Sequence, residues 1–433
     1  MFPRRRWLLA CGIMPHVGGA RNHSIAAGVR RGLLGAVGLA FFLALALKLV
    51  PTSARRPWDF ETYWYASKAA SQGLNPYDTD TLVRLARRPV GMPFLYAPIT
   101  MPLLMPLTLM SIERAAQVWF ATKLLLLILL VLLWRRYFLP HSSVVLIAAV
   151  AAFGFNGASV WDLRTGNVAI IEQLVLWAGF AAFTLERRLL FALCVVTAAL
   201  FKLFPIAFLT LLMVPSRKQG PDWKLAAGAL ALFACLTLVP TLAGPAWARS
   251  FLHNVPAERP WGLVNPSAMA FIDTLLDDHT TPLTAPPFKA LSLLLAYDGV
   301  LVGISIPTLR RLWRRRNPRE WVLAGAVLYA LLVPRMMVYS YLLVLVPVLA
   351  LITPPRLGGR TLVAGLVVSQ ALLRPILGLR YTDIWSSNLS FLILLGFWLV
   401  YLARGGRHSK ADLEPKDQPT GRDRVARRLK LRA

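Results

Sequence analysis

Long apolar runs recur along nearly the whole chain, and they limit what it can fold into more than any other feature. Most of them approach the roughly 20 residues that a helix needs to cross the ~30 Å core of a bilayer. Of the 433 residues, 57% are hydrophobic and only 16% are charged, whereas soluble domains average about 25% charged. The sequence therefore predicts an all-α polytopic membrane protein.

Hydrophobic length and basic flanks divide the chain into three parts. We expect a basic leader over residues 1–31, a transmembrane domain over 32–403 and a basic, disordered tail over 404–433. About ten full spans fit the middle part. Their expected positions are 32–50, 113–134, 143–160, 168–185, 224–243, 288–306, 320–333, 337–353, 361–376 and 388–403.

The strong positive charge follows this topology. The chain carries 48 Lys and Arg against 20 Asp and Glu, a formal net charge of +28. Most basic residues cluster between spans, which indicates orientation and not nucleic-acid binding, because cytoplasmic loops are enriched in Lys and Arg. Both termini are then cytoplasmic, and residues 51–97 and 244–286 are large outer loops. The basic tail is expected to contact anionic membrane lipids.

Two apolar segments do not suit a full span. Residues 94–110 contain three prolines, which favours a re-entrant or half-crossing segment. Residues 189–214 have basic residues on both flanks, so one crossing would place one cluster outside. Lys202 and Pro205 interrupt this run. We therefore predict two half-length helices that enter the membrane and return on the same side.

An acidic and aromatic stretch, Trp58-Asp59-Phe60-Glu61-Thr62-Tyr63-Trp64-Tyr65, follows the first span. A membrane anchor needs aromatic residues at the interface but no carboxylates. Asp59 or Glu61 could therefore serve as an acid or base for a lipid-borne substrate. The alternative is an aromatic belt with two solvated acids. We expect residues 61–74 to form a helix on the membrane surface.

An ordered set of short motifs resembles glycosyltransferase family 87, a family of C-type membrane glycosyltransferases. The motifs are Asp59-Phe60, Gly73-Leu74-Asn75-Pro76-Tyr77, Phe94-Leu95-Tyr96-Ala97-Pro98, Thr165-Gly166-Asn167, Lys202-Leu203-Phe204-Pro205 and Asn265-Pro266-Ser267. The resemblance covers roughly residues 33–400. It implies that the membrane domain is catalytic, with re-entrant or half-length helices and outer-face helices beside the full spans.

The resemblance also implies a reaction. Such enzymes resemble mannosyltransferases that use a polyprenyl-phosphate sugar as donor and act with inversion, without a nucleotide sugar. Carried over to this chain, Asp59 would be the base that takes the proton of the acceptor hydroxyl. The leaving lipid phosphate is already anionic and needs no strong general acid. We expect no cofactor, and the six histidines show no metal-ligand spacing.

Other polar and aromatic residues are candidates for substrate binding. Lys202, inside an apolar run, could hold the donor phosphate or extend to the headgroups as an anchor. Arg164 and Arg335, at expected outer ends of spans, could grip the phosphate or anchor in the headgroups. The full set of candidate binding residues is Glu61, Tyr63, Arg164, Asn167, Lys202, His253, Asn265, Arg335 and Tyr339.

The sequence favours one function over its rivals. Together with the resemblance, it favours transfer of a mannose-like hexose from a polyprenyl-phosphate donor to a lipid-linked or glycan acceptor, at the outer face of a bacterial cytoplasmic membrane. A secondary transporter or lipid flippase would place its polar groups at the bilayer midplane, whereas here they collect in the outer loops. A lipid-linked polysaccharide polymerase or ligase remains the second enzymatic alternative.

Overall fold

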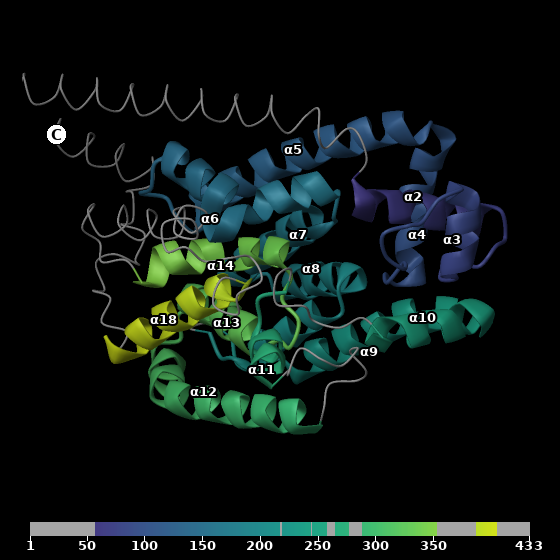
Figure 1. Cartoon of the computed structure of the whole chain (residues 1–433). Helices are drawn as coiled ribbons and strands as arrows, with labels where there is room; N and C mark the ends of the chain where they lie inside the picture. Colours follow the sequence, from purple (N-terminus) through teal and green to yellow (C-terminus); the bar gives the residue numbers. More distant parts are fainter. Residues whose placement is uncertain are drawn as a thin grey trace, which may run out of the picture. The chain divides into compact units, whose positions relative to one another are not determined.

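A computed structural model describes residues 57–216, 219–243, 245–257, 265–276, 288–352 and 387–404, and every regular element in these ranges is a helix (Figure 1). The leader, the tail after residue 404, and the expected spans at 32–50 and 361–376 lie outside the described residues. The first helices are α2 (Trp58–Ser71), α3 (Thr79–Ala86), η1 (Pro98–Thr100), α4 (Met101–Leu104), η2 (Met105–Leu109), α5 (Ile112–Tyr137), α6 (Val144–Thr165), α7 (Ala169–Thr184) and α8 (Arg188–Phe201).

The second half of the chain continues the helical pattern. Three of these later elements are irregular: η3 and η4 are 3₁₀ helices, and η5 is a π-helical turn that continues α14. The elements are η3 (Phe204–Met213), α9 (Trp223–Ala243), α10 (Pro245–Ala257), α11 (Ala268–Leu276), α12 (Phe288–Arg315), α13 (Pro318–Leu332), η4 (Val338–Tyr341), α14 (Leu342–Pro347), η5 (Val348–Ile352) and α18 (Leu389–Ala403).

Within the described residues, three helices are long and apolar enough to cross a bilayer by themselves: α5, α6 and α12. Shorter apolar helices accompany them, among them α7, α8, α9 and α18. Large apolar side chains such as Leu125 and Leu132 on α5 are exposed, as a lipid-facing surface requires. These features are those of a membrane protein, and α5, α6 and α7 pack side by side in it (Figure 1).

The predicted break after residue 201 is confirmed. Helix α8 ends at Phe201, Lys202 is extended with φ −144° and ψ 127°, and η3 begins with Pro205 in its first turn. The chain then returns: Arg188, at the start of α8, donates to the carbonyl oxygens of Val214 and Gln219, both at 3.3 Å. The start of α8 and the end of η3 therefore lie at the same end of a helical hairpin.

The proline-rich segment is also short and broken, as predicted. Residues 98–109 form η1, α4 and η2 in succession, because proline lacks the N–H that a continuous α-helix would use. This segment covers α2, where the indole of Trp64 donates to the Leu107 carbonyl oxygen at 3.1 Å. A small core of Phe60, Tyr63 and Trp119 fills the space between α2 and α5.

Two expectations about local structure were wrong. Helix α2 begins at Trp58 and not at residue 61, and most of its side chains are buried, so it is an enclosed helix and not one with a solvated face. Residues 161–167 were expected to form a short outer loop between the spans at 143–160 and 168–185, but α6 continues to Thr165. Residues 154–157 are not helical and divide α6 into two parts at a kink, where Ser159 donates to the freed Ala151 carbonyl oxygen at 2.6 Å.

Candidate active site

Asp59 lies in the first turn of α2, where a helix N-terminus stabilises a negative charge. Its side chain is only 1% exposed. The amide of Asn167 donates to Asp59 Oδ2 at 2.8 Å and also lies 3.1 Å from the Tyr63 hydroxyl and 3.3 Å from the Tyr96 hydroxyl. The two phenols are themselves hydrogen-bonded at 2.6 Å. One amide thus joins a carboxylate to a pair of tyrosines.

The carboxylate of Asp59 is electrostatically unusual. Burial raises its pKa to about 6, and the hydrogen bond from Asn167 is the main effect that opposes the rise. Its second oxygen, Oδ1, has no hydrogen-bond partner among the residues that the structure describes. A carboxylate with a pKa near neutrality and an unused oxygen is suited to accepting a proton.

The position of Asn167 is fixed by the turn between α6 and α7. Gly166 adopts a left-handed conformation with φ +73° and ends α6. Asn167 Oδ1 accepts from the backbone N–H of Ala169 at 3.0 Å. Because the oxygen of the amide is used by α7, the nitrogen faces Asp59, and the hydrogen-bond network assigns the orientation of the amide.

A cavity opens on the other side of Asn167 and Tyr96. Its lining residues come from the segment before η1, the turn between α6 and α7, the α8–η3 break, and η4 with the segment before it. They are Met92, Pro93, Leu95, Tyr96, Asn167, Phe201, Lys202, Leu203, Phe204, Arg335, Met337, Tyr339 and Ser340. The cavity therefore collects four of the predicted site residues: Asn167, Lys202, Arg335 and Tyr339.

Lys202 is held in this wall by three partners. Its ammonium lies 2.6 Å from a Glu172 carboxylate oxygen, 3.0 Å from the Ser340 hydroxyl and 4.9 Å from the centre of the Tyr339 ring. The side chain of Glu172 is 4% exposed, whereas the side chain of Lys202 is 21% exposed. The lysine therefore faces the cavity while its counter-ion lies behind it. Arg335 adds a second cation to the lining.

The sequence also matches a known protein family. The model of glycosyltransferase family 87 matches residues 94–334, which is more than half of the chain. The chain belongs to glycosyltransferase family 87. It is thus a membrane glycosyltransferase, and the resemblance seen in its motifs is confirmed. A search of curated proteins returns no match.

The family match includes most of the cavity, but Asp59 precedes it. Tyr96, Asn167 and Lys202 lie within residues 94–334, and Arg335 follows directly after. Tyr96 belongs to one of the family motifs but was not predicted to have a role, and Glu172 was not among the predicted site residues. The signal for Glu172 was present: an acid in an apolar helix needs a partner, and Lys202 is the cation of the neighbouring hairpin.

Several other candidates of this glycosyltransferase lie away from the cavity. Glu61 pairs with Arg88 and is two residues from Asp59 on a helix, so the two carboxylates point to different sides. Arg164 is exposed, with its guanidinium 5.5 Å from the centre of the Trp161 ring. Asn265 is buried beside Pro266, whose carbonyl oxygen accepts from the Tyr341 hydroxyl.

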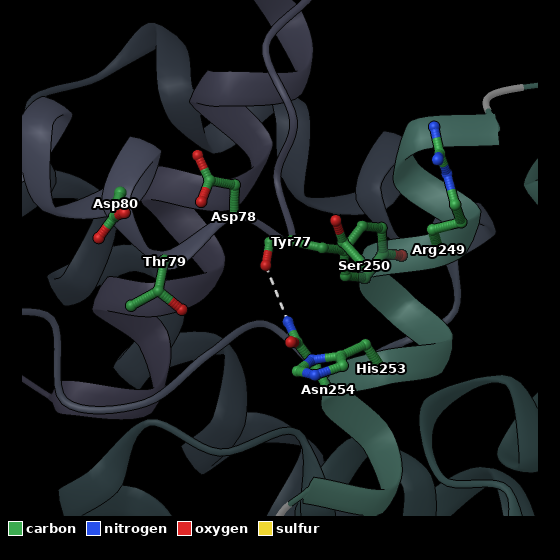
Figure 2. A pocket seen from close by; sticks show the side chains of 8 residues that line it. All are labelled: Tyr77, Asp78, Thr79, Asp80, Arg249, Ser250, His253 and Asn254. Carbon is green, nitrogen blue, oxygen red and sulfur yellow. Dashed lines mark hydrogen bonds between the residues drawn. The ribbon is translucent and has the colours of Figure 1, made fainter.

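His253 lies in a second, polar groove, which Figure 2 shows. One side is formed by residues 77–80 at the start of α3 and the other by α10. Asn254 donates to the Tyr77 carbonyl oxygen at 2.8 Å, the contact drawn in Figure 2. Tyr77 in turn donates to the Tyr96 carbonyl oxygen at 2.7 Å. One buried tyrosine thus connects the groove to the wall of the cavity.

Proposed function

We propose that this glycosyltransferase moves a mannose-like hexose from a polyprenyl-phosphate donor to a lipid-linked or glycan acceptor. The observation that supports it is a buried carboxylate of raised pKa, Asp59, one amide away from a cavity with two cations. Lys202 and Arg335 bind the donor phosphate. The exposed apolar side chains of Leu203 and Phe204 border the same cavity and receive the first part of the lipid chain.

The reaction then needs one base and no strong acid. The acceptor oxygen attacks the anomeric carbon as the bond from that carbon to the phosphate oxygen breaks, with inversion. The proton of the acceptor hydroxyl passes to Asp59 Oδ1 and later to water. The polyprenyl phosphate leaves as an anion, and Lys202 and Arg335 stabilise its charge.

Access to Asp59 is part of the proposal. The carboxylate is buried directly behind Asn167 and Tyr96, which line the cavity. The acceptor reaches Asp59 Oδ1 when Tyr96 rotates aside, while Asn167 stays hydrogen-bonded to Oδ2. Catalytic hydrogen bonds that are absent or long in an apo structure often form only in the substrate complex. We place the reaction at the outer face of a bacterial cytoplasmic membrane, with both termini in the cytoplasm, because the basic residues collect on the opposite side.

A reconstituted assay tests the function. Purified protein is incubated with a short-chain polyprenyl-phosphate mannose and a membrane lipid extract, and release of polyprenyl phosphate is followed. We expect release that depends on the acceptor extract and no reaction with a nucleotide sugar. Sugar transfer from the nucleotide sugar alone would contradict the donor assignment. Repeated addition to one acceptor would instead indicate a polymerase.

The two arginines that were candidates for the phosphate give a matched test. Replacing Arg335 with Gln should weaken donor binding roughly 10-fold or more, since a hydrogen bond to a charged group contributes about 1.5–3 kcal/mol. Replacing Arg164 with Gln should leave donor affinity unchanged, because Arg164 lies outside the cavity. Binding of a fluorescent polyprenyl-phosphate sugar measures both. Equal effects would reject Arg335 as a specific phosphate ligand.

The activity should depend on pH through the state of Asp59. Its pKa is raised to about 6 by burial, so the base is ionised above that pH and protonated below it. We expect kcat/KM to be constant above pH 7 and to fall about tenfold for each pH unit below about 6. A pH–rate profile measures this limb. A flat profile between pH 4.5 and 7.5, roughly spanning that pKa, would exclude Asp59 as the titrating group.

A further inference from the structure

A fully buried ion pair joins α5 to α6 beneath the site. Lys123 Nζ lies 2.7 Å from Asp162 Oδ2, and both side chains are 0% exposed. The ammonium also donates to the Asp162 backbone carbonyl oxygen. Moving an ion pair out of water costs several kcal/mol per ion, and well-packed apolar residues are often as stable. Stability alone is therefore a weak reason for this pair.

Asp162 organises the turn that carries Asn167. Its backbone carbonyl oxygen accepts from Gly166 N at 3.0 Å and from Asn167 N at 3.2 Å. Its side-chain Oδ1 accepts from Ala169 N at 3.1 Å, in the first turn of α7. Asp162 thus binds the end of α6, the turn and the start of α7. Lys123, on α5, in turn fixes Asp162 through their ion pair.

Helix α5 supports the same turn a second time. Trp119 lies one helical turn before Lys123, and its indole N–H donates to the Gly166 carbonyl oxygen at 2.7 Å. The Trp119 ring also stacks on Phe60, with ring centres 5.5 Å apart, and Phe60 follows Asp59 in α2. The face of α5 that carries Trp119 and Lys123 therefore touches both sides of the hydrogen bond between Asn167 and Asp59.

We propose that Lys123 and Asp162 are positioning residues that hold the Asn167 amide against the Asp59 carboxylate. Neither lines the cavity, so neither contacts the substrate. The proposal rests on the proposed role of Asp59 as base. The charge of Lys123 also favours the ionised form of Asp59, and Asp162 opposes it more weakly. The hydroxyls of Tyr63, Tyr96 and Tyr339 also interact electrostatically with Asp59.

The test removes both charges together. Lys123→Met alone would leave Asp162 buried and unpaired, at a cost of about 3–5 kcal/mol, so Lys123→Met is combined with Asp162→Asn. We expect the double variant to fold and to bind the polyprenyl-phosphate sugar as before. Its kcat should fall ~10–10²-fold, because small displacements of reacting groups have effects of that size. The acidic limb of the pH profile should move to higher pH.

The same two substitutions, made in the Asp59→Asn protein, distinguish a positioning role of Lys123 and Asp162 from a general structural role. If the pair acts through Asp59, adding Lys123→Met and Asp162→Asn to Asp59→Asn should cause no further loss of kcat. Removing the Arg315–Glu320 ion pair of α12 and α13 serves as a control that should leave kcat unchanged. Trp119→Phe, which loses the N–H on Gly166 and part of the ring that stacks on Phe60, should give a smaller loss of the same kind if the double variant cannot be purified.

Three results would overturn the proposal. The first is an unchanged, wild-type kcat and pH profile in the double variant, or in Trp119→Phe if Trp119→Phe is used in its place. The second is a loss in the Asp59→Asn background as large as in the wild type, which would mean that the pair acts independently of the base. The third is full activity of Asp59→Asn itself, which would reject the base and so the proposed mechanism.

Discussion

Replacing Asp59 with Asn should lower turnover by at least ~10²-fold while donor binding remains near normal. Loss of a general base typically costs ~10²–10⁴-fold. Asparagine keeps the volume of the side chain and, with its oxygen toward Asn167, the hydrogen bond that Asp59 Oδ2 now accepts at 2.8 Å. The phosphate contacts come from Lys202 and Arg335, on other elements. The change therefore removes the proton acceptor and little else.

Glu61→Gln is the matched control for this experiment. Glu61 belongs to the same helical turn but pairs with Arg88, and the side chain of Arg88 is 32% exposed. Glutamine keeps the volume of the buried Glu61 side chain and an oxygen that can accept from Arg88, and Glu61 does not line the cavity, so this variant should retain most of its turnover. An inactive Glu61→Gln beside an active Asp59→Asn would show that the other carboxylate is the base. Two active variants would place the base elsewhere.

The helical hairpin at α8 and η3 could be predicted because its cause is local. Lys202 and Pro205 interrupt an apolar run, and the basic flanks must lie on one side of the membrane. Both facts are visible in the sequence. The hairpin then brings Lys202 to Glu172 and Ser340, and the last of these contacts joins residues 138 positions apart. Which side chains meet depends on tertiary packing that local patterns do not determine.

The same limit explains what was missed around Asp59. Asp59 and Asn167 are 108 residues apart, and both belonged to motifs of the family, yet neither motif indicated a hydrogen bond between them. Asp162 was assigned to a loop because hydrophobic length ended the expected span at residue 160. A buried partner, Lys123, allows α6 to carry that charge to Thr165. A lone lysine in the apolar run of α5 was the available signal for such a partner.

Gly166→Ala should be strongly destabilising, because this position combines two constraints. Its φ of +73° is a conformation that costs an L-residue about 1–2 kcal/mol. An added Cβ would also lie 2.6 Å from Phe60 Cβ and 2.8 Å from Pro57 Cβ. Both neighbours are Cβ atoms, of Phe60 in α2 and of its N-cap Pro57. A Cβ atom moves only with the backbone, so rotation of a side chain cannot relieve the contact. Overpacking of this kind adds about 1–3 kcal/mol.

Gly73→Ala separates the two contributions. Gly73 has nearly the same φ, +70°, but a Cβ there would meet nothing within 4 Å. Thermal unfolding in detergent should therefore show a small loss for Gly73→Ala and a clearly larger one for Gly166→Ala. Equal losses would mean that the approach of the turn to α2 is unimportant. Since Phe60 adjoins Asp59, relief of the clash must also move the base relative to Asn167. Any folded Gly166→Ala protein should thus lose turnover ~10²-fold, and Gly73→Ala should not.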